Sequence, residues 1–219
     1  MSRSALQILA HLIVLLTIPL HECAHGLVSL WLGDPTAKAQ GRLTLNPLRH
    51  LDLFGSISML ILGIGWAKPV PVNPYYYKNR KLGMAVSAAA GPVANLLLAY
   101  IFMLAYKICA WISLAGQGGA LLENVCLVLY MVVLVNLNLA VFNLLPLPPF
   151  DGSRIVTLVL PEKLYFRVMR YERYIMLAIL VIFYLGVLHA PLAWLREGMF
   201  TALDWASGYI DLIAYRMFL

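Results

Sequence analysis

Long apolar runs are the feature that most restricts how this chain can fold. They cover about residues 5–32, 84–113, 121–147 and 174–195, and a helix needs about 20 mostly apolar residues to cross a bilayer. Of all residues, 62% are hydrophobic and 12% charged, whereas a soluble domain is about half apolar and a quarter charged. A soluble fold of this size could not bury so much apolar surface. The sequence therefore predicts an integral membrane protein with helical spans.

Two further segments complete the predicted architecture. Residues 33–83 are rich in proline and contain an extended stretch at Ala67–Asn73, while residues 55–66 are apolar but too short to span and fit a re-entrant or interfacial element. The tail at 199–219 is either a tilted span or a surface helix, the second being slightly favoured. We expect one all-α polytopic membrane domain over residues 1–219, with a core at about 5–154 and C-terminal helices at about 161–219. It should have about four to five transmembrane helices and a small membrane-associated β-element between the first two.

Basic residues indicate the orientation of the chain. They gather in residues 33–83 and 154–173, whereas residues 115–122 have none, so the two basic segments are expected to face the cytoplasm. These loops explain the net charge of +6 better than nucleic-acid binding does. The three cysteines lie in apolar runs at no metal-like spacing and are expected to be small core side chains rather than a disulfide framework: Cys23, Cys109 and Cys126.

Three ionisable residues, His21, Glu22 and His25, fall within the first apolar run. Residues four apart share one face of a helix, so His21 and His25 can hold one metal ion, and zinc suits such donors. Glu22 can accept a proton from water that the metal activates. Because charged groups are costly in an apolar helix, a bound metal explains this cluster better than chance does. The alternative is a buried polar cluster that joins helices without metal.

A catalytic zinc site usually has three protein ligands. Asp151 is the candidate for the third, because it follows the third apolar run near the same predicted cytoplasmic level as His25. A helix cap or a turn is the alternative role for Asp151. Asp34 and Asp52 lie among turn residues and are expected to be solvated loop positions.

Four motifs, in this order, resemble the site-2 proteases, a family of intramembrane zinc metalloproteases, and the resemblance covers about residues 19–154. The resemblance implies a three-helix core with the active site inside the bilayer, nearer the cytoplasm. It implies one zinc ion, hydrolysis of transmembrane substrates, and a location in the prokaryotic inner membrane. The family's membrane-associated sheet pairs with unwound substrate along its edge. The motifs are His21–His25, Gly65–Asn73, Ala90–Asn95 and Asn143–Gly152.

The resemblance also implies roles for individual residues. His21, His25 and Asp151 correspond to the metal ligands, and Glu22 corresponds to the catalytic acid/base. Asn95 matches an asparagine close to the family's active site, where it would hold substrate backbone or stabilise the oxyanion. An interhelical hydrogen bond is an equally weighted alternative for Asn95.

Many members carry additional helices before the zinc motif and an inserted PDZ domain, and this sequence looks like a short form without them. The expected partners are the lipid bilayer and a transmembrane protein or peptide substrate, with no nucleic acid and with a homodimer left open. Competing classes are a transporter or zinc-dependent scaffold and a catalytically silent relative. A transporter should show polar groups along a path, whereas here they lie at one level and the outer half of the spans has almost none. No motif residue is missing, which argues against a silent relative.

Overall fold

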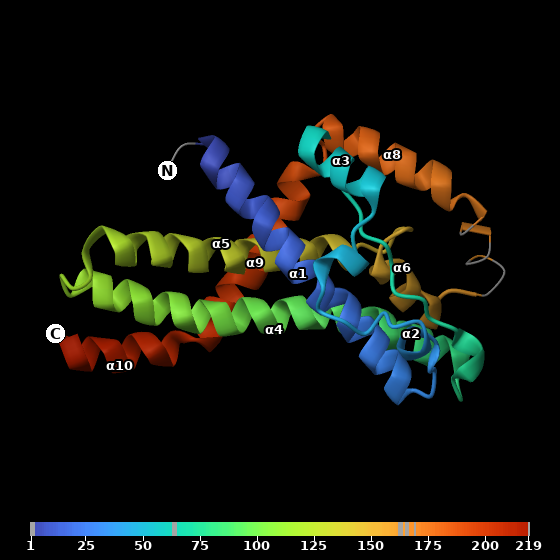
Figure 1. The fold of residues 1–219 in the computed structure, drawn as a ribbon, viewed down its shortest axis with the longest axis horizontal. Coiled ribbons are helices and arrows are strands. Elements are labelled where there is room, and N and C mark those ends of the chain that lie inside the picture. The colour runs from blue at the N-terminus through green and yellow to red at the C-terminus, as the bar shows by residue number, and fades with distance from the viewer. Residues whose placement is uncertain (1–2, 63–64, 162–163, 165–166, 169, 219) are drawn as a thin grey trace.

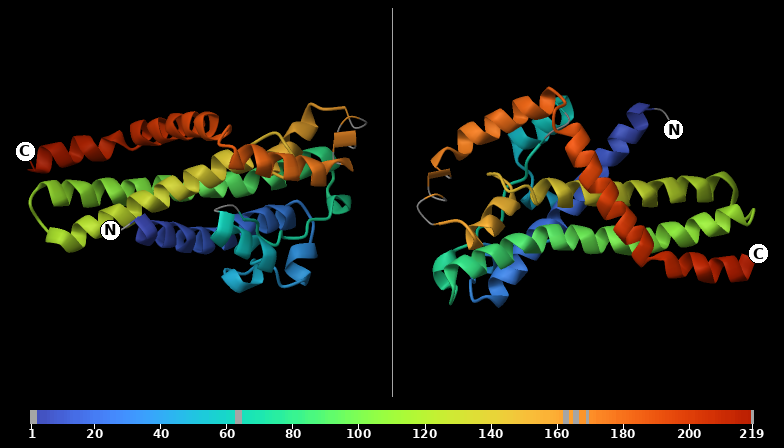
Figure 2. Two further views of the ribbon diagram at one scale, coloured as in Figure 1. Left: turned by 90° about the horizontal axis from the view of Figure 1, so that it is seen from above. Right: turned by 180° about the vertical axis from the view of Figure 1, so that it is seen from behind.

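The computed structural model describes residues 3–62, 65–161, 164, 167–168 and 170–218, which form a layered bundle of helices (Figure 1). Seen from above, α4 and α5 form the middle layer, with α1 on one side and the C-terminal helices on the other (Figure 2). The helices are α1 (Arg3–Trp31), α2 (Thr36–Ala39), α3 (Leu53–Leu62), α4 (Arg80–Leu114), α5 (Gly119–Asn143), α6 (Asp151–Ile155), α8 (Glu172–Tyr184), α9 (His189–Ala206) and α10 (Gly208–Phe218).

Three of the described helices are long and apolar enough to cross a membrane: Ala5–Trp31 within α1, α4 and α5. They agree with the first three predicted spans to within a few residues at most ends. Large apolar side chains on these helices point outward, among them Leu16 and Leu97, which are 67% and 58% exposed. Because water would disfavour so much exposed apolar surface, these faces indicate contact with lipid, and the chain is an integral membrane protein.

The fourth predicted span is not one straight helix. Residues 174–195 divide between α8 and α9, whose axes differ by 87°, so the described helices give a fourth crossing only if this bent pair is counted as one. Gly186, just past the end of α8, has a φ of +78°, a left-handed conformation that ends helices and suits glycine. Pro191 lies in the first turn of α9, where its missing N–H is tolerated. The tail also divides, between the end of α9 and α10.

The predicted β-element between the first two spans is not seen, since the described residues contain no strand. A single antiparallel bridge joins Leu51 to Ala67, and the stretch after Ala67 is extended but irregular. Pro69 and Pro71 have no N–H to donate, which prevents a regular ladder along this stretch. Arg42 replaces part of that ladder, because its Nη2 donates to the carbonyls of Lys68 at 2.7 Å and Pro69 at 3.2 Å.

The C-terminal helices are fixed to α4 at both apolar and charged contacts. Fully buried side chains from α4 and α5, including Met103 and Leu137, pack against residues of α9 such as Phe200. Nearer the α4–α5 turn, the ammonium group of Lys107 lies 2.8 Å from an oxygen of Asp204 and 2.5 Å from one of Asp211. Lys107 is thus an exception to the expectation that the outer half of the spans has almost no polar groups.

Two of the three cysteines are joined, contrary to expectation. Cys109 in α4 and Cys126 in α5 form a disulfide with their Cα atoms 5.7 Å apart. The short turn between these antiparallel helices brings the two positions to one level. Cys23 is free and buried, and its Sγ donates to the carbonyl of Thr44 at 3.2 Å.

Candidate metal centre

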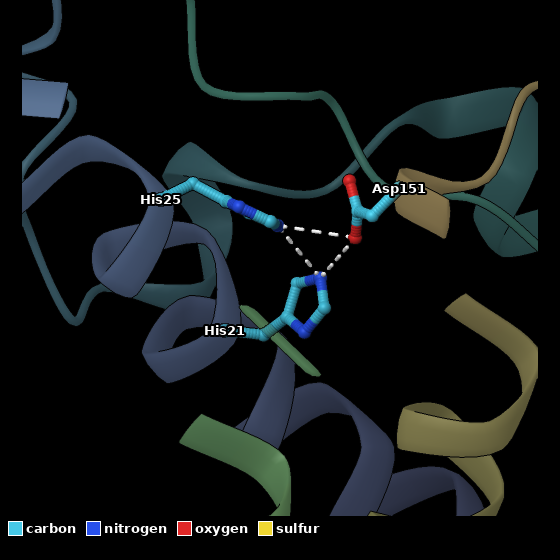
Figure 3. A group of neighbouring side chains, drawn as sticks. All are labelled: His21, His25 and Asp151. Atoms are coloured by element: carbon cyan, nitrogen blue, oxygen red, sulfur yellow. Dashed lines mark hydrogen bonds and ion pairs between the residues drawn. The ribbon is translucent and has the colours of Figure 1, made fainter. Parts of the chain in front are cut away.

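Helix α1 presents two buried imidazoles one turn apart. The Nε2 atoms of His21 and His25 lie 3.0 Å from each other, and both point toward Asp151 (Figure 3). On His25, Nδ1 donates to the carbonyl of Ser87 in α4 at 2.7 Å. That hydrogen bond orients the ring and leaves the lone pair of Nε2 free, the arrangement typical of metal-binding histidines.

Asp151 is the first residue of α6 and completes the group. Its Oδ2 lies 3.3 Å from Nε2 of His21 and 3.2 Å from Nε2 of His25. The backbone can place Asp151 here because the next residue is glycine. A Cβ on residue 152 would lie 2.3 Å from the carbonyl oxygen of Leu144, so any other residue would push α6 away. Burial opposes ionisation of Asp151, but hydrogen bonds with the two imidazoles outweigh it and hold the pKa of the carboxyl well below its usual range.

The three donor atoms fit a zinc ion. In a tetrahedral site with metal–ligand distances of about 2.0–2.1 Å, neighbouring donors lie about 3.3 Å apart. The observed separations of 3.0, 3.2 and 3.3 Å form one face of such a tetrahedron. Gly91 of α4 faces the same point, since a Cβ there would lie 2.3 Å from Nε2 of His25 and 2.6 Å from that of His21. The absence of a side chain at Gly91 therefore leaves room where the imidazole nitrogens meet.

Glu22 does not belong to this triangle but lines the same cavity of about 280 Å³. Its Oε2 accepts a hydrogen bond from the backbone N–H of Val70 at 2.9 Å. The cavity is also lined by Pro69, Val72 and Arg154. The carboxylate of Glu22 is thus held between the histidine pair and the extended stretch.

Asp34, which was expected to be solvated, is fully buried. It accepts hydrogen bonds from Ser29 Oγ at 2.8 Å, from the backbone N–H of Asn73 at 2.7 Å, and from both the N–H and the hydroxyl of Thr36. Burial opposes ionisation, but these donors lower the pKa of Asp34 below its usual value. Asp34 therefore fixes the far end of the extended stretch to the end of α1, a role that turn composition did not reveal.

The two remaining acid and amide candidates lie away from the triangle. Asp52, partly exposed, accepts from the N–H of Gly55 at 2.8 Å and caps the start of α3. Asn95 lies one helical turn after Gly91 and is fully buried, yet neither atom of its amide has a partner among the described residues. Asn95 is not among the residues that line the cavity.

Comparisons with known proteins agree with this architecture. The sequence model of Peptidase family M50 matches residues 105–185. Relatives that carry the name "Putative zinc metalloprotease" include YwhC of Bacillus subtilis, 39% identical over 81% of this chain and 82% of the relative. MJ0611 of Methanocaldococcus jannaschii is 32% identical over 48% of this chain and 49% of its own length. Rip2 of Mycolicibacterium smegmatis is 29% identical over 63% of this chain and 52% of its own length. No solved structure matches significantly.

A membrane helix bundle with two imidazoles and a carboxylate converging on one point, beside a second carboxylate, defines a membrane metalloenzyme. The identity to YwhC over most of both chains and the match of the family model specify which kind. The chain belongs to Peptidase family M50, the site-2 proteases, and is a metalloendopeptidase.

Proposed function

We propose that this protein is a zinc-dependent intramembrane endopeptidase that hydrolyses transmembrane substrates near the cytoplasmic side of the bilayer. In this proposal His21, His25 and Asp151 hold one zinc ion, and Glu22 is the catalytic acid/base. The observation that carries it is the triangle of donor atoms 3.0–3.3 Å apart at a position that Gly91 leaves open.

In this proposal the residues around the triangle have separate roles in catalysis. When bound, zinc supplies a Lewis acid that lowers the pKa of water and polarises the scissile carbonyl. Glu22 takes up a proton on its carboxylate and later delivers it to the leaving amine. The hydrogen bond from Val70 to Oε2 holds the carboxylate in one orientation during both transfers. Ser87 keeps the proton of His25 on Nδ1, away from the metal side of the ring.

The substrate has to reach this site as an extended chain, because a helix shields its own carbonyls. The stretch around Val70 lies along the catalytic cavity and is held at both ends, by Arg42 and by Asp34. We propose that it receives the unwound substrate segment. For Asn95, which is fully buried and does not line the cavity, we propose contact with substrate backbone or oxyanion once the bound substrate displaces the side chains that cover the amide, since a buried amide without partners is unfavourable.

Two features at opposite ends of the bundle support the orientation. The described parts of the basic segments 33–83 and 154–173 lie at the metal end of α4 and α5, as expected for cytoplasmic loops of a prokaryotic inner-membrane protein. The Cys109–Cys126 disulfide lies toward the α4–α5 turn, and disulfides persist on the oxidising side of a membrane.

The test is cleavage of a model transmembrane substrate by purified protein and by Glu22→Gln. We expect the parent to cut, a chelator to abolish cutting and added zinc to restore it. The variant should bind zinc normally while losing about 10²–10⁴-fold in rate. Equal cutting by parent and variant would exclude Glu22 as the base. A parent that binds zinc but cuts nothing would favour the transporter, the scaffold or the silent relative.

A further inference from the structure

A second cavity, of about 580 Å³, adjoins the catalytic cavity and is lined by four polar side chains that are partly or largely exposed. His11 comes from α1, Asn138 from α5, and His189 and Arg196 from α9, while most of the lining is apolar. The two cavities adjoin because they share lining residues: Val14, Met59, Gly65, Leu139 and Phe142.

The ionisable side chains that line this second cavity are all basic. The lining contains Arg196 and two histidines but no acidic residue. Nη2 of Arg196 pairs with the exposed Glu197 at 2.8 Å, whereas its buried Nε has no partner among the described residues. A guanidinium offers five N–H donors in a plane, so the ion pair with Glu197 leaves Arg196 further donors for a second carboxylate. Ionisable groups at membrane depth are costly, and they usually mark functional sites.

The separation between this cavity and the metal centre can be estimated along α1. His11 precedes His21 by ten residues, which corresponds to about 15 Å along α1. An extended substrate covers that distance in about four to five residues, at about 3.3 Å each. The cavity lies on the side of the metal centre away from the basic loops, because the N-terminal part of α1 lies there.

We infer that this cavity selects substrates by binding a carboxylate side chain, Asp or Glu, about four to five residues from the cleaved bond. Arg196 is the main donor to that carboxylate, and His11 and His189 line the same site. The carboxylate lies in the part of the substrate deeper in the membrane. This inference rests on the proposed proteolysis and adds the substrate feature that it would recognise.

The experiment uses transmembrane substrates that differ only at the positions three to six residues from the cut, with Leu, Asn or Asp in turn. For the parent we expect kcat/KM for the best Asp substrate to exceed that for Leu by about tenfold or more. Arg196→Met should lose the preference, so that its kcat/KM for the Asp substrate falls to that for the Leu substrate. Glu197→Gln, which releases Nη2 of Arg196 from its ion pair, should keep the preference or strengthen it. An unchanged preference in Arg196→Met would refute the inference.

A second readout does not depend on cleavage or on the folding of Arg196→Met. A photo-crosslinker placed beside the substrate Asp should label residues 189–196 of Glu22→Gln, as mapped by mass spectrometry. Labelling confined to other helices would overturn the assignment. If the parent cuts no substrate at all, the proposed proteolysis fails, while the crosslinking still reports whether the cavity binds the acidic segment.

Discussion

Replacing Gly91 by alanine tests the metal centre without touching any proposed ligand. The added Cβ would lie 2.3 Å from Nε2 of His25 and 2.5 Å from Cε1 of His21, whereas ordinary contacts exceed 3.4 Å. One or both rings would therefore have to move by about 1 Å, several times the roughly 0.2 Å that metal–ligand distances tolerate. Loss of a single supporting partner already lowers metal affinity 10–100-fold, so we expect Gly91→Ala to lose about 100-fold or more.

The assay is competition for zinc against a chelator of known affinity, followed by metal analysis of the dialysed protein. Alanine is about 1 kcal/mol better than glycine inside a helix, so the substitution does not weaken α4 by propensity. Helicity by circular dichroism should remain that of the parent. Val93→Ala, at a half-exposed position on the same helix, is the control and should bind zinc normally. Zinc affinity of Gly91→Ala within threefold of the parent would refute the assigned geometry.

Two further predictions concern the parts that support the site. Asp34→Asn should lower the stability of the folded protein by about 2 kcal/mol at neutral pH, because an amide cannot accept from all the donors around that carboxylate. Since folding lowers the pKa of Asp34, its stabilisation is present above about pH 4 and is lost as the pH falls through the folded-state pKa, so thermal unfolding of parent and variant should converge in acid. Lys107→Met should free the C-terminal helices from α4 and speed protease cleavage after Ala206 several-fold, with zinc content unchanged; cleavage at the parent rate would show that apolar packing alone fixes them.

The lengths of apolar runs predicted the three long helices because burial in lipid depends mainly on local composition. Run length alone did not predict the bend between α8 and α9, because the bend depends on the left-handed turn at one residue, Gly186. Nor did run length predict the pairing of Lys107, whose charge is compensated by acids almost 100 residues later in the chain. Pairings of this kind belong to the tertiary structure, and a single run cannot reveal them.

The candidate site was predictable to the extent that it depends on one helix. Spacing by four residues dictates that His21 and His25 share a face, but nothing local dictates that Asp151 reaches them. That approach depends on Gly152, which lets α6 fold back against the carbonyls of Leu144 and Leu145. The resemblance supplied the pairing that spacing could not, and the burial of Asp34 had no local signal at all.

The prolines that prevent a sheet between α1 and α4 also determine what the extended stretch can offer a substrate. Pro69 and Pro71 have no N–H, the N–H of Val70 goes to Glu22, and that of Asn73 goes to Asp34. No described backbone N–H donates to the carbonyls of Val70, Pro71 and Val72. This stretch therefore offers three carbonyls and only one N–H, that of Val72, so a substrate that pairs with it does so mainly through its own N–H groups. A substrate helix that unwinds frees the N–H groups of the unwound residues, which can then pair with these carbonyls beside Glu22.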